Sequence, residues 1–103
     1  MYKRALSFTS TVRQITTKFP PEGVFALTSQ YRRAADSIVL NIAEGAESGS
    51  NKEFAKFLGY SIRSGYECSG CADISAAQNY LTKKKPNFLS NLTSTNKRKE
   101  TAP

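Results

Sequence analysis

Histidine is absent from this chain of 103 residues, and cysteine occurs only twice. The missing histidine removes the commonest general base and the commonest metal ligand. The two cysteines form a single Cys68-x-x-Cys71 motif, which supplies half of the four ligands that zinc needs. We therefore expect no catalytic residue, no cofactor and no metal. Two reduced, partly buried thiols on a helix are the favoured interpretation, and a metal shared between subunits is the alternative.

Long apolar runs are also missing, and none approaches the roughly 18 residues of a transmembrane helix. The N-terminus is basic, but no apolar stretch follows it as in a secretory signal. These absences predict a cytoplasmic protein with no membrane partner. The length of 103 residues, with 39% hydrophobic residues, leaves room for one domain with a modest core.

Acidic residues are scarce toward the C-terminus. Residues 1–82 contain nine Lys/Arg and seven Asp/Glu, a balance of +2, whereas residues 83–103 contain six Lys/Arg and one Glu, a balance of +5. A basic segment of this kind favours non-specific contact with nucleic acid. A solvated tail without a partner is an equally supported interpretation.

The apolar residues that are present follow a helical period between the proline and glycine breaks. We expect an all-α fold with three helices, over residues 3–19, 24–44 and 51–80, in one domain that ends at residue 82. The apolar positions are Ala5, Phe8, Val12, Ile15 and Phe19 in the first helix, Leu27, Tyr31, Ala34, Ile38 and Ile42 in the second, and Phe54, Phe57, Leu58, Ile62, Cys68, Ala72 and Ala76 in the third.

The ends of these helices carry their own signals. Ser50 and Glu53 form a capping box at the start of the third helix, and Gly45 stands where the second helix is expected to end. Residues 83–103 are dominated by Asn, Ser, Thr and Lys, which favour caps, turns and disorder over helix. We expect this segment to be a basic, disordered tail or a degenerate fourth helix.

The run from Leu27 to Gly45, LTSQYRRAADSIVLNIAEG, resembles the hallmark of the bacterial 23S ribosomal RNA intervening-sequence proteins, a four-helix-bundle family. Lys52-Glu53-Phe54, Phe57-Leu58, Ser64 and Glu67 continue the match, and so does Phe19-Pro20. The resemblance covers about residues 5–82, and Asn-Ile-Ala-Glu-Gly is its most specific part.

This resemblance implies an up-down bundle of four antiparallel helices that assembles into a homo-oligomer, with a pentamer as the familiar form. It implies no enzymatic activity and no small-molecule substrate. Relatives include accessory proteins that present a basic surface to nucleic acid. The family's amphipathic fourth helix has no clear counterpart after Lys83, which suggests a truncated or frameshifted terminus.

A polar stripe runs beside the apolar one on the second helix. Its members are Gln30, Arg33, Ser37, Asn41 and Glu44, at steps of three and four residues. We expect a packing network that fixes the register between helices, with Arg33 paired to Glu44 or to a partner's carboxylate. Contact with a ligand or RNA is the alternative, and an active site is disfavoured because no nucleophile–base pair is present.

Five basic residues are candidates for binding nucleic acid. They are Arg32, Arg33, Lys52, Lys56 and Arg63. Phosphate contacts need only suitably spaced Lys and Arg, so the pattern is weakly specific, and a solvated helix face is the competing interpretation. Repetition of the group around a ring would strengthen it.

The leading hypothesis is thus a non-enzymatic, oligomeric helical protein that binds RNA or DNA through basic helix faces. A protein–protein assembly module without a nucleic-acid role is the first alternative. A truncated or frameshifted relative without function is the second.

Overall fold

The computed structural model describes residues 1–20 and 24–80, which form α1 (Tyr2–Thr17), α2 (Phe25–Ala46) and α3 (Asn51–Ala77). The described residues contain no strand, so the all-α prediction is confirmed. The helices predicted over residues 3–19, 24–44 and 51–80 correspond to α1, α2 and α3, respectively. The four-helix bundle is shown only as far as these three helices, because the expected fourth helix or tail lies outside the described residues.

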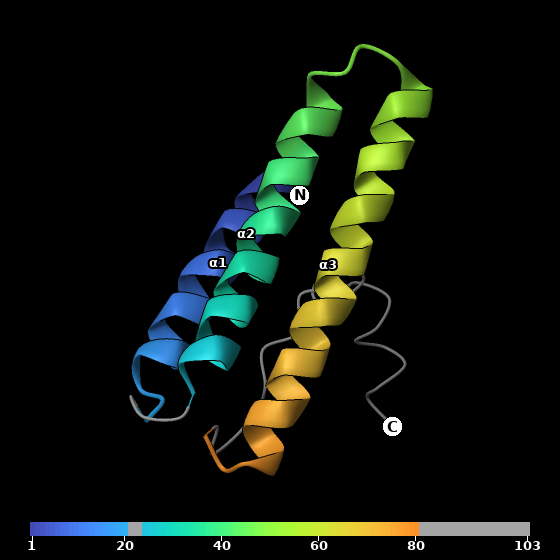
Figure 1. Cartoon of the computed structure of the whole chain (residues 1–103). Helices are drawn as coiled ribbons and strands as arrows, with labels where there is room; N and C mark the ends of the chain where they lie inside the picture. Colours follow the sequence, from blue (N-terminus) through green and yellow to red (C-terminus); the bar gives the residue numbers. More distant parts are fainter. Residues whose placement is uncertain (21–23, 81–103) are drawn as a thin grey trace, which may run out of the picture.

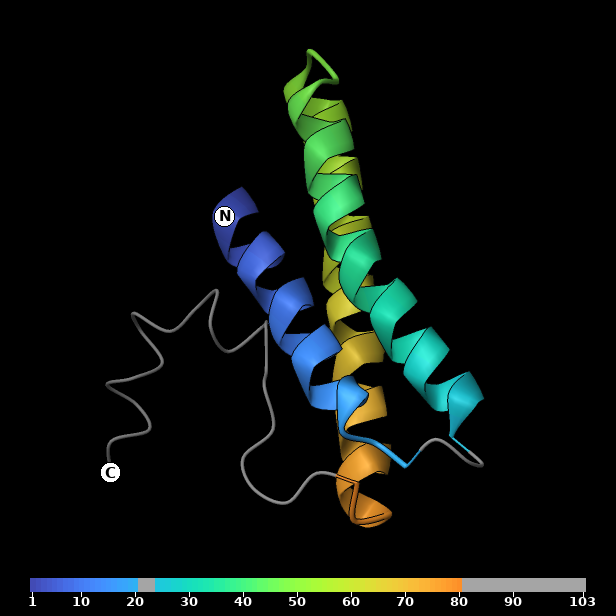
Figure 2. The same ribbon diagram turned by 90° about the vertical axis from the view of Figure 1, so that its left-hand side faces the viewer.

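The central helix is α2, which packs against α1 on one side and α3 on the other. Successive helices run in opposite directions, and α1 is the shortest of the three (Figure 1). Seen from the side, α1 lies beside α2 with a similar inclination, and both are tilted relative to α3 (Figure 2). The arrangement is therefore a long hairpin with a shorter helix laid against its first arm.

One apolar face of α1 packs against α2. Ala5, Phe8 and Val12 are buried, and Ile15 is partly buried. Thr16 is also buried, and its hydroxyl donates to the Val12 carbonyl at 2.8 Å. Helix formation here depends on burying this face, because the threonines of α1 have low helix propensity.

The apolar stripe predicted for α2 forms the centre of the core. Tyr31, Ala34, Ile38 and Ile42 are buried, and Leu27 is half-buried. Ala35 is fully buried between the same faces. The alternation of small and large side chains allows α2 to approach two helices at once.

The predicted capping box at the start of α3 is confirmed for the Ser50 cap, whereas the Glu53 side chain pairs with Lys56. The Ser50 side chain accepts a hydrogen bond from the Glu53 amide at 3.1 Å. This bond satisfies one of the amides that a helix start leaves without a partner.

The expectation that Gly45 ends α2 is wrong. The helix continues through Ala46, and its C-cap is Glu47. Gly45 is buried, and a Cβ at this position would lie 3.1 Å from Cβ of Phe57 and 3.2 Å from Cδ1 of Phe54. A side chain here would therefore require Phe54 and Phe57 of α3 to move, and the positive φ of 82° occurs at Gly49 in the following turn.

Small residues, rather than large apolar ones, cover most of the buried face of α3. The buried positions are Ser61, Ser64, Gly65, Cys68, Cys71, Ala72 and Ser75. The predicted face is thus correct at Cys68 and Ala72 but wrong at Phe54 and Ile62, which are exposed. The hydroxyl groups of the buried serines donate hydrogen bonds to acceptors within the protein. These bonds replace the hydrogen bonds to water that burial removes.

Candidate nucleic-acid interface

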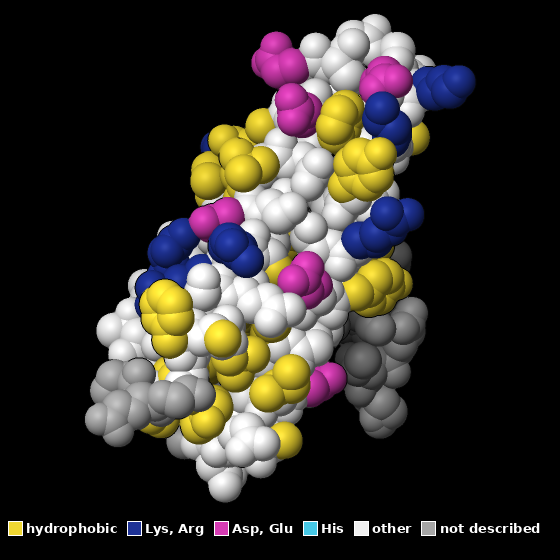
Figure 3. All heavy atoms as spheres, in the orientation of Figure 1, with side chains coloured by type: hydrophobic (Ala, Val, Ile, Leu, Met, Phe, Trp, Pro, Cys, Tyr) yellow, Lys and Arg dark blue, Asp and Glu magenta, His cyan; other side chains and the backbone are white. Residues whose placement is uncertain are grey.

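Basic side chains lie in two groups on the face shown in Figure 3, one over α1 and α2 and one along α3. We call Lys52, Lys56 and Arg63 the α3 basic group; all three are exposed. At a rise of 1.5 Å per residue, Lys52 and Lys56 are about 6 Å apart along the helix and Arg63 follows about 10 Å further on.

Aromatic rings accompany two members of the α3 basic group. The Lys56 ammonium lies 5.1 Å from the ring centre of Phe57, and the Arg63 guanidinium lies 5.9 Å from that of Tyr60. Both distances allow cation–π attraction. Tyr60 is 38% exposed and was not among the predicted site residues, although its position three residues before Arg63 is a recognisable signal.

Lys56 is the one member with an acidic partner among the described residues. Its Nζ lies 3.0 Å from Glu53 Oε1, one turn earlier on the same helix. This hydrogen bond raises the pKa of Lys56, so the side chain remains fully charged at neutral pH. Because both partners are about half exposed, the pair is open to exchange with another anion.

The two predicted arginines of α2 do not join the α3 basic group. The half-buried Arg32 turns toward α1, where its Nε donates to Thr16 Oγ1 at 2.8 Å. Arg33 is exposed and has no acidic partner within the described residues. The five predicted residues therefore do not form one continuous patch.

The arginine group over α1 and α2 includes a residue that the sequence did not single out. Arg13 of α1 pairs with Asp36 of α2 at 2.6 Å, and Thr9 donates to the other oxygen of the same carboxylate at 2.5 Å. This contact links the first two helices. Because its charge is already paired, Arg13 is a weaker candidate for phosphate contact than Arg33.

Three members of the predicted polar stripe form hydrogen bonds at or near the α2–α3 contact. Gln30 donates to Glu67 at 3.2 Å, and Asn41 donates to the Ser37 hydroxyl at 3.1 Å, which in turn accepts from Ser64 at 3.0 Å.

The other two members, Arg33 and Glu44, are exposed and are not paired with each other. In the described part of the chain, the stripe therefore divides into an interhelical network and two solvent-facing charges.

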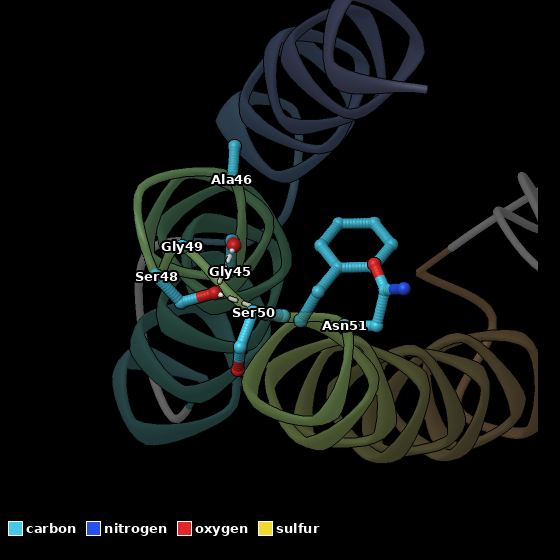
Figure 4. Close-up of a pocket in the computed structure, with 7 residues that line it drawn as sticks. Gly45, Ala46, Ser48, Gly49, Ser50 and Asn51 are labelled. Atoms are coloured by element: carbon cyan, nitrogen blue, oxygen red, sulfur yellow. Dashed lines mark hydrogen bonds between the residues drawn. The ribbon is translucent and has the colours of Figure 1, made fainter.

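A shallow hollow lies at the turn between α2 and α3 (Figure 4). Its lining residues are Gly45, Ala46, Ser48, Gly49, Ser50, Asn51 and Phe54. The Ser48 hydroxyl donates to the Gly45 carbonyl at 2.7 Å and so belongs to the turn itself. Since none of these lining side chains is titratable, the hollow offers no acid–base chemistry.

The two cysteines are buried on α3, close to the buried ring of Tyr31. Burial raises the pKa of Cys68 to about 12, and it also raises the pKa values of Cys71 and Tyr31. Reactive thiols need a lowered pKa and access to solvent. Both cysteines are free thiols, and no group of three potential metal-ligating side chains occurs within residues 1–20 and 24–80.

A comparison with known protein families identifies the group of proteins to which this chain belongs. The model of the 23S rRNA-intervening sequence protein family matches residues 1–100. The chain belongs to this family. No curated protein matches it.

The family match extends past residue 82, where the resemblance seen in the sequence ended. It therefore includes most of the basic C-terminal segment, whose structure lies outside the described residues.

The 23S rRNA-intervening sequence protein hallmark, residues 27–45, coincides with α2 and with the contacts that α2 makes to both neighbours. Tyr31 and Ile38 are fully buried, Asn41 bonds to Ser37, and the final Gly45 admits the aromatic residues of α3. Most of the hallmark thus specifies helix packing. In the described part of the chain, no helix combines the length and apolar character needed to cross a membrane.

Proposed function

We propose that this 23S rRNA-intervening sequence protein is a non-enzymatic, oligomeric helical protein that binds RNA through the α3 basic group. The observation that carries the proposal is the combination of Lys52, Lys56, Tyr60 and Arg63 on one exposed stretch of α3. Lysine and arginine bind phosphate, and an exposed aromatic ring provides a surface on which an unpaired base stacks. The family name is consistent with RNA as the partner.

The spacing along α3 suits a backbone contact rather than sequence recognition. Lys52 and Lys56 occupy successive turns, so their ammonium groups reach two phosphates of one strand. Phosphate contacts position a nucleic acid but do not distinguish its sequence. We therefore expect RNA binding that depends strongly on salt and weakly on base order, with preference for single-stranded segments if Tyr60 stacks on a base.

Oligomerisation increases the effect of such a small basic group. Two or more copies on one assembly bind one RNA with an effective concentration set by their separation, so avidity exceeds the affinity of a single copy. A pentamer is the form implied by the family resemblance. A protein–protein assembly module without a nucleic-acid role is the second candidate function, and the large apolar side chains exposed on α3 favour it.

An RNA titration at several salt concentrations tests the proposal. Fluorescence anisotropy with a labelled single-stranded RNA should give a log–log salt dependence, and the K52A/K56A variant should reduce the magnitude of its slope by about 1.4. Lys18→Ala is the matched control, because Lys18 is an exposed lysine at the end of α1, away from this group. Equal affinity and slope for the wild type and K52A/K56A would contradict the proposal and favour the assembly module.

A further inference from the structure

Two exposed tyrosines lie about one turn on either side of Arg63 on α3. Tyr60 precedes the arginine by three residues and Tyr66 follows it by three, so each is its neighbour on the helix surface. Tyr60 is 38% exposed and Tyr66 is 65% exposed. The three side chains form a row on the surface of α3, which we call the Tyr60–Arg63–Tyr66 row.

Contacts within α3 hold the first half of this row in place. The ring of Tyr60 packs edge-on against that of Phe57, with ring centres 5.7 Å apart and an angle of 85° between the ring planes. The Arg63 guanidinium lies 5.9 Å from the centre of the Tyr60 ring. A ring that is already positioned by its neighbours loses little conformational entropy when a ligand stacks on it.

Two glycines leave the helix surface open around Tyr66. At 100° per residue, Gly59 and Gly70 lie within about 40° of Tyr66 around the helix. A Cβ at either glycine would meet no atom within 4 Å, so neither serves the packing of the described helices as Gly45 does. Glycine is favoured where a ligand approaches a backbone closely. The ring of Tyr66 is therefore accessible to a flat group that lies on the surface of α3.

The charges along α3 favour an anionic occupant for this row. Residues 54–66 contain two basic side chains and no acidic one, and basic and hydrophobic side chains alternate along α3 on the face shown in Figure 3. Of the flanking carboxylates, Glu53 pairs with Lys56. Glu67 accepts a hydrogen bond from Gln30 of α2. Exposed rings interleaved with positive charge are typical of surfaces that bind single-stranded nucleic acid, because bases stack on the rings and phosphates meet the cations.

The spacing of the two rings determines the kind of strand that fits. At a rise of 1.5 Å per residue, Tyr60 and Tyr66 are about 9 Å apart along the helix axis. Neighbouring nucleotides of a stacked strand are only about 3.4 Å apart. Bases that reach both rings must therefore be drawn apart from each other. A duplex does not offer such bases, and a single strand whose own bases stack weakly loses least on binding.

We propose that the Tyr60–Arg63–Tyr66 row binds an unstacked, pyrimidine-rich single strand of RNA. One base stacks on Tyr60 and another on Tyr66, Arg63 binds a phosphate between them, and the strand passes over the open surface at Gly59. This inference rests on the proposed function and deepens it, because it adds base stacking and a preference for pyrimidines to the phosphate contacts of the α3 basic group.

RNA without bases isolates the stacking contribution. Fluorescence anisotropy compares a labelled oligouridine with an abasic oligoribonucleotide of the same length, which has the same phosphates. The wild type should bind the oligouridine about tenfold or more tightly, and Y60A/Y66A should bind the two strands equally. Y60F/Y66F keeps both rings and should behave as the wild type. A wild type that does not distinguish the two strands would overturn the proposal.

An oligoadenosine of the same length tests the preference for pyrimidines. It should bind the wild type more weakly than the oligouridine, because its bases must first unstack from one another. Ile74→Ala, which removes an exposed apolar side chain of α3 outside the row, is the matched control and should preserve this order. Equal or tighter binding of oligoadenosine would contradict the preference.

Salt dependence separates the role of the rings from that of Arg63. Y60A/Y66A should weaken binding to oligouridine without changing the slope of log Kd against log salt, since neither tyrosine binds a phosphate. Arg63→Ala should reduce the magnitude of that slope by about 0.7, the value for one phosphate of a single strand. A smaller slope in the tyrosine variant, or an unchanged slope in Arg63→Ala, would contradict these roles.

A glycine substitution tests the path of the strand without removing a ring. Gly59→Leu fills the open surface but improves helix propensity, so it should weaken binding to oligouridine severalfold without lowering the thermal midpoint. Ala26→Leu, on an exposed position of α2, is the matched control and should leave RNA binding unchanged. Unchanged affinity in Gly59→Leu would overturn the path over this surface.

The two proposals fail in distinguishable ways. If K52A/K56A lowers the salt dependence while the wild type binds oligouridine and the abasic strand equally, the stacking row is overturned and the proposed function stands. If the wild type binds none of these strands, the proposed function is overturned together with the row.

Discussion

The α2–α3 contact and the α1–α2 contact hold their helices together by different means. Between α2 and α3, small residues allow close approach, and buried hydroxyl groups bond across the helices: Ser61 donates to the Ile38 carbonyl at 3.0 Å and Ser64 to the Ser37 hydroxyl. Between α1 and α2, apolar side chains pack beside two polar contacts, the partly exposed Arg13–Asp36 ion pair and the hydrogen bond from half-buried Arg32 to the Thr16 hydroxyl.

The difference has consequences for stability. A closely packed contact tolerates no added volume and leaves no room for a side chain to adjust. An exposed ion pair contributes little and is weakened by salt. The α2–α3 hairpin is therefore expected to be the stable unit of the described fold, with α1 as its more easily detached neighbour.

The largest effect is expected from Gly45→Ala, which adds one methyl group where α2 and α3 lie close together. Overpacking should cost about 1–3 kcal/mol, because the new Cβ meets Cβ of Phe57, which moves only with the α3 backbone. The gain in helix propensity of roughly 1 kcal/mol offsets only part of this cost. Urea denaturation measures the change.

Gly59→Ala is the matched control for this substitution. It brings the same gain in helix propensity into open space, so it should stabilise the monomer by about 0.5–1 kcal/mol. Equal changes in the free energy of unfolding for the two variants would show that the α2–α3 contact is looser than the distances indicate.

An intermediate effect is expected from alkaline pH, which acts on the same contact. Burial raises the pKa of Cys68 from 9.0 to about 12, and the pKa of Tyr31 is raised in the same direction. Above pH 9 the unfolded chain releases protons that the folded chain retains, so stability is present below that pH and falls as the pH rises toward 12.

Urea midpoints at pH 8 and pH 10 measure this alkaline effect. The free energy of unfolding should fall by about 1–2 kcal/mol between these pH values. The Cys68→Ala variant should show a smaller drop, since it lacks the thiol with the largest contribution among the cysteines. An equal drop in the variant and the wild type would contradict the assignment to Cys68.

The smallest effect is expected at the α1–α2 contact. Asp36→Asn removes the charge that pairs with Arg13 but keeps an oxygen acceptor for Thr9. The loss of stability should be at most about 1 kcal/mol at low salt, and it should shrink when salt is raised. Thermal unfolding of both proteins at low and high salt measures it. A loss that is larger or insensitive to salt would place this ion pair among the principal contacts.

The sequence predicted the parts of the fold that depend on large apolar residues and on local capping. Tyr31, Ala34, Ile38 and Ile42 follow a helical period and are all buried, and Ser50 caps α3 as its sequence indicates. These signals are local, so a single sequence contains them.

The predictions that are wrong concern positions where small residues form the contact between helices. Ser61, Ser64 and Ser75 form part of the buried face of α3, yet a hydrophobic pattern does not mark serines whose hydroxyl groups bond to the protein. Gly45 is predicted to end a helix because a close contact with another helix is not visible in the local sequence. The division of the basic residues into two groups likewise depends on the direction in which each helix face points in the folded structure, which the local sequence does not contain.

Native-state amide hydrogen exchange tests the central difference between the two contacts most directly. If the α2–α3 hairpin is the stable unit, the amides of the α2–α3 contact, including that of Ile38, should exchange slowest, and those of α1 should exchange through a lower-energy opening. Protection in α1 equal to that in α2 and α3 would show instead that the three helices unfold together, and it would contradict the hierarchy derived from the two contacts.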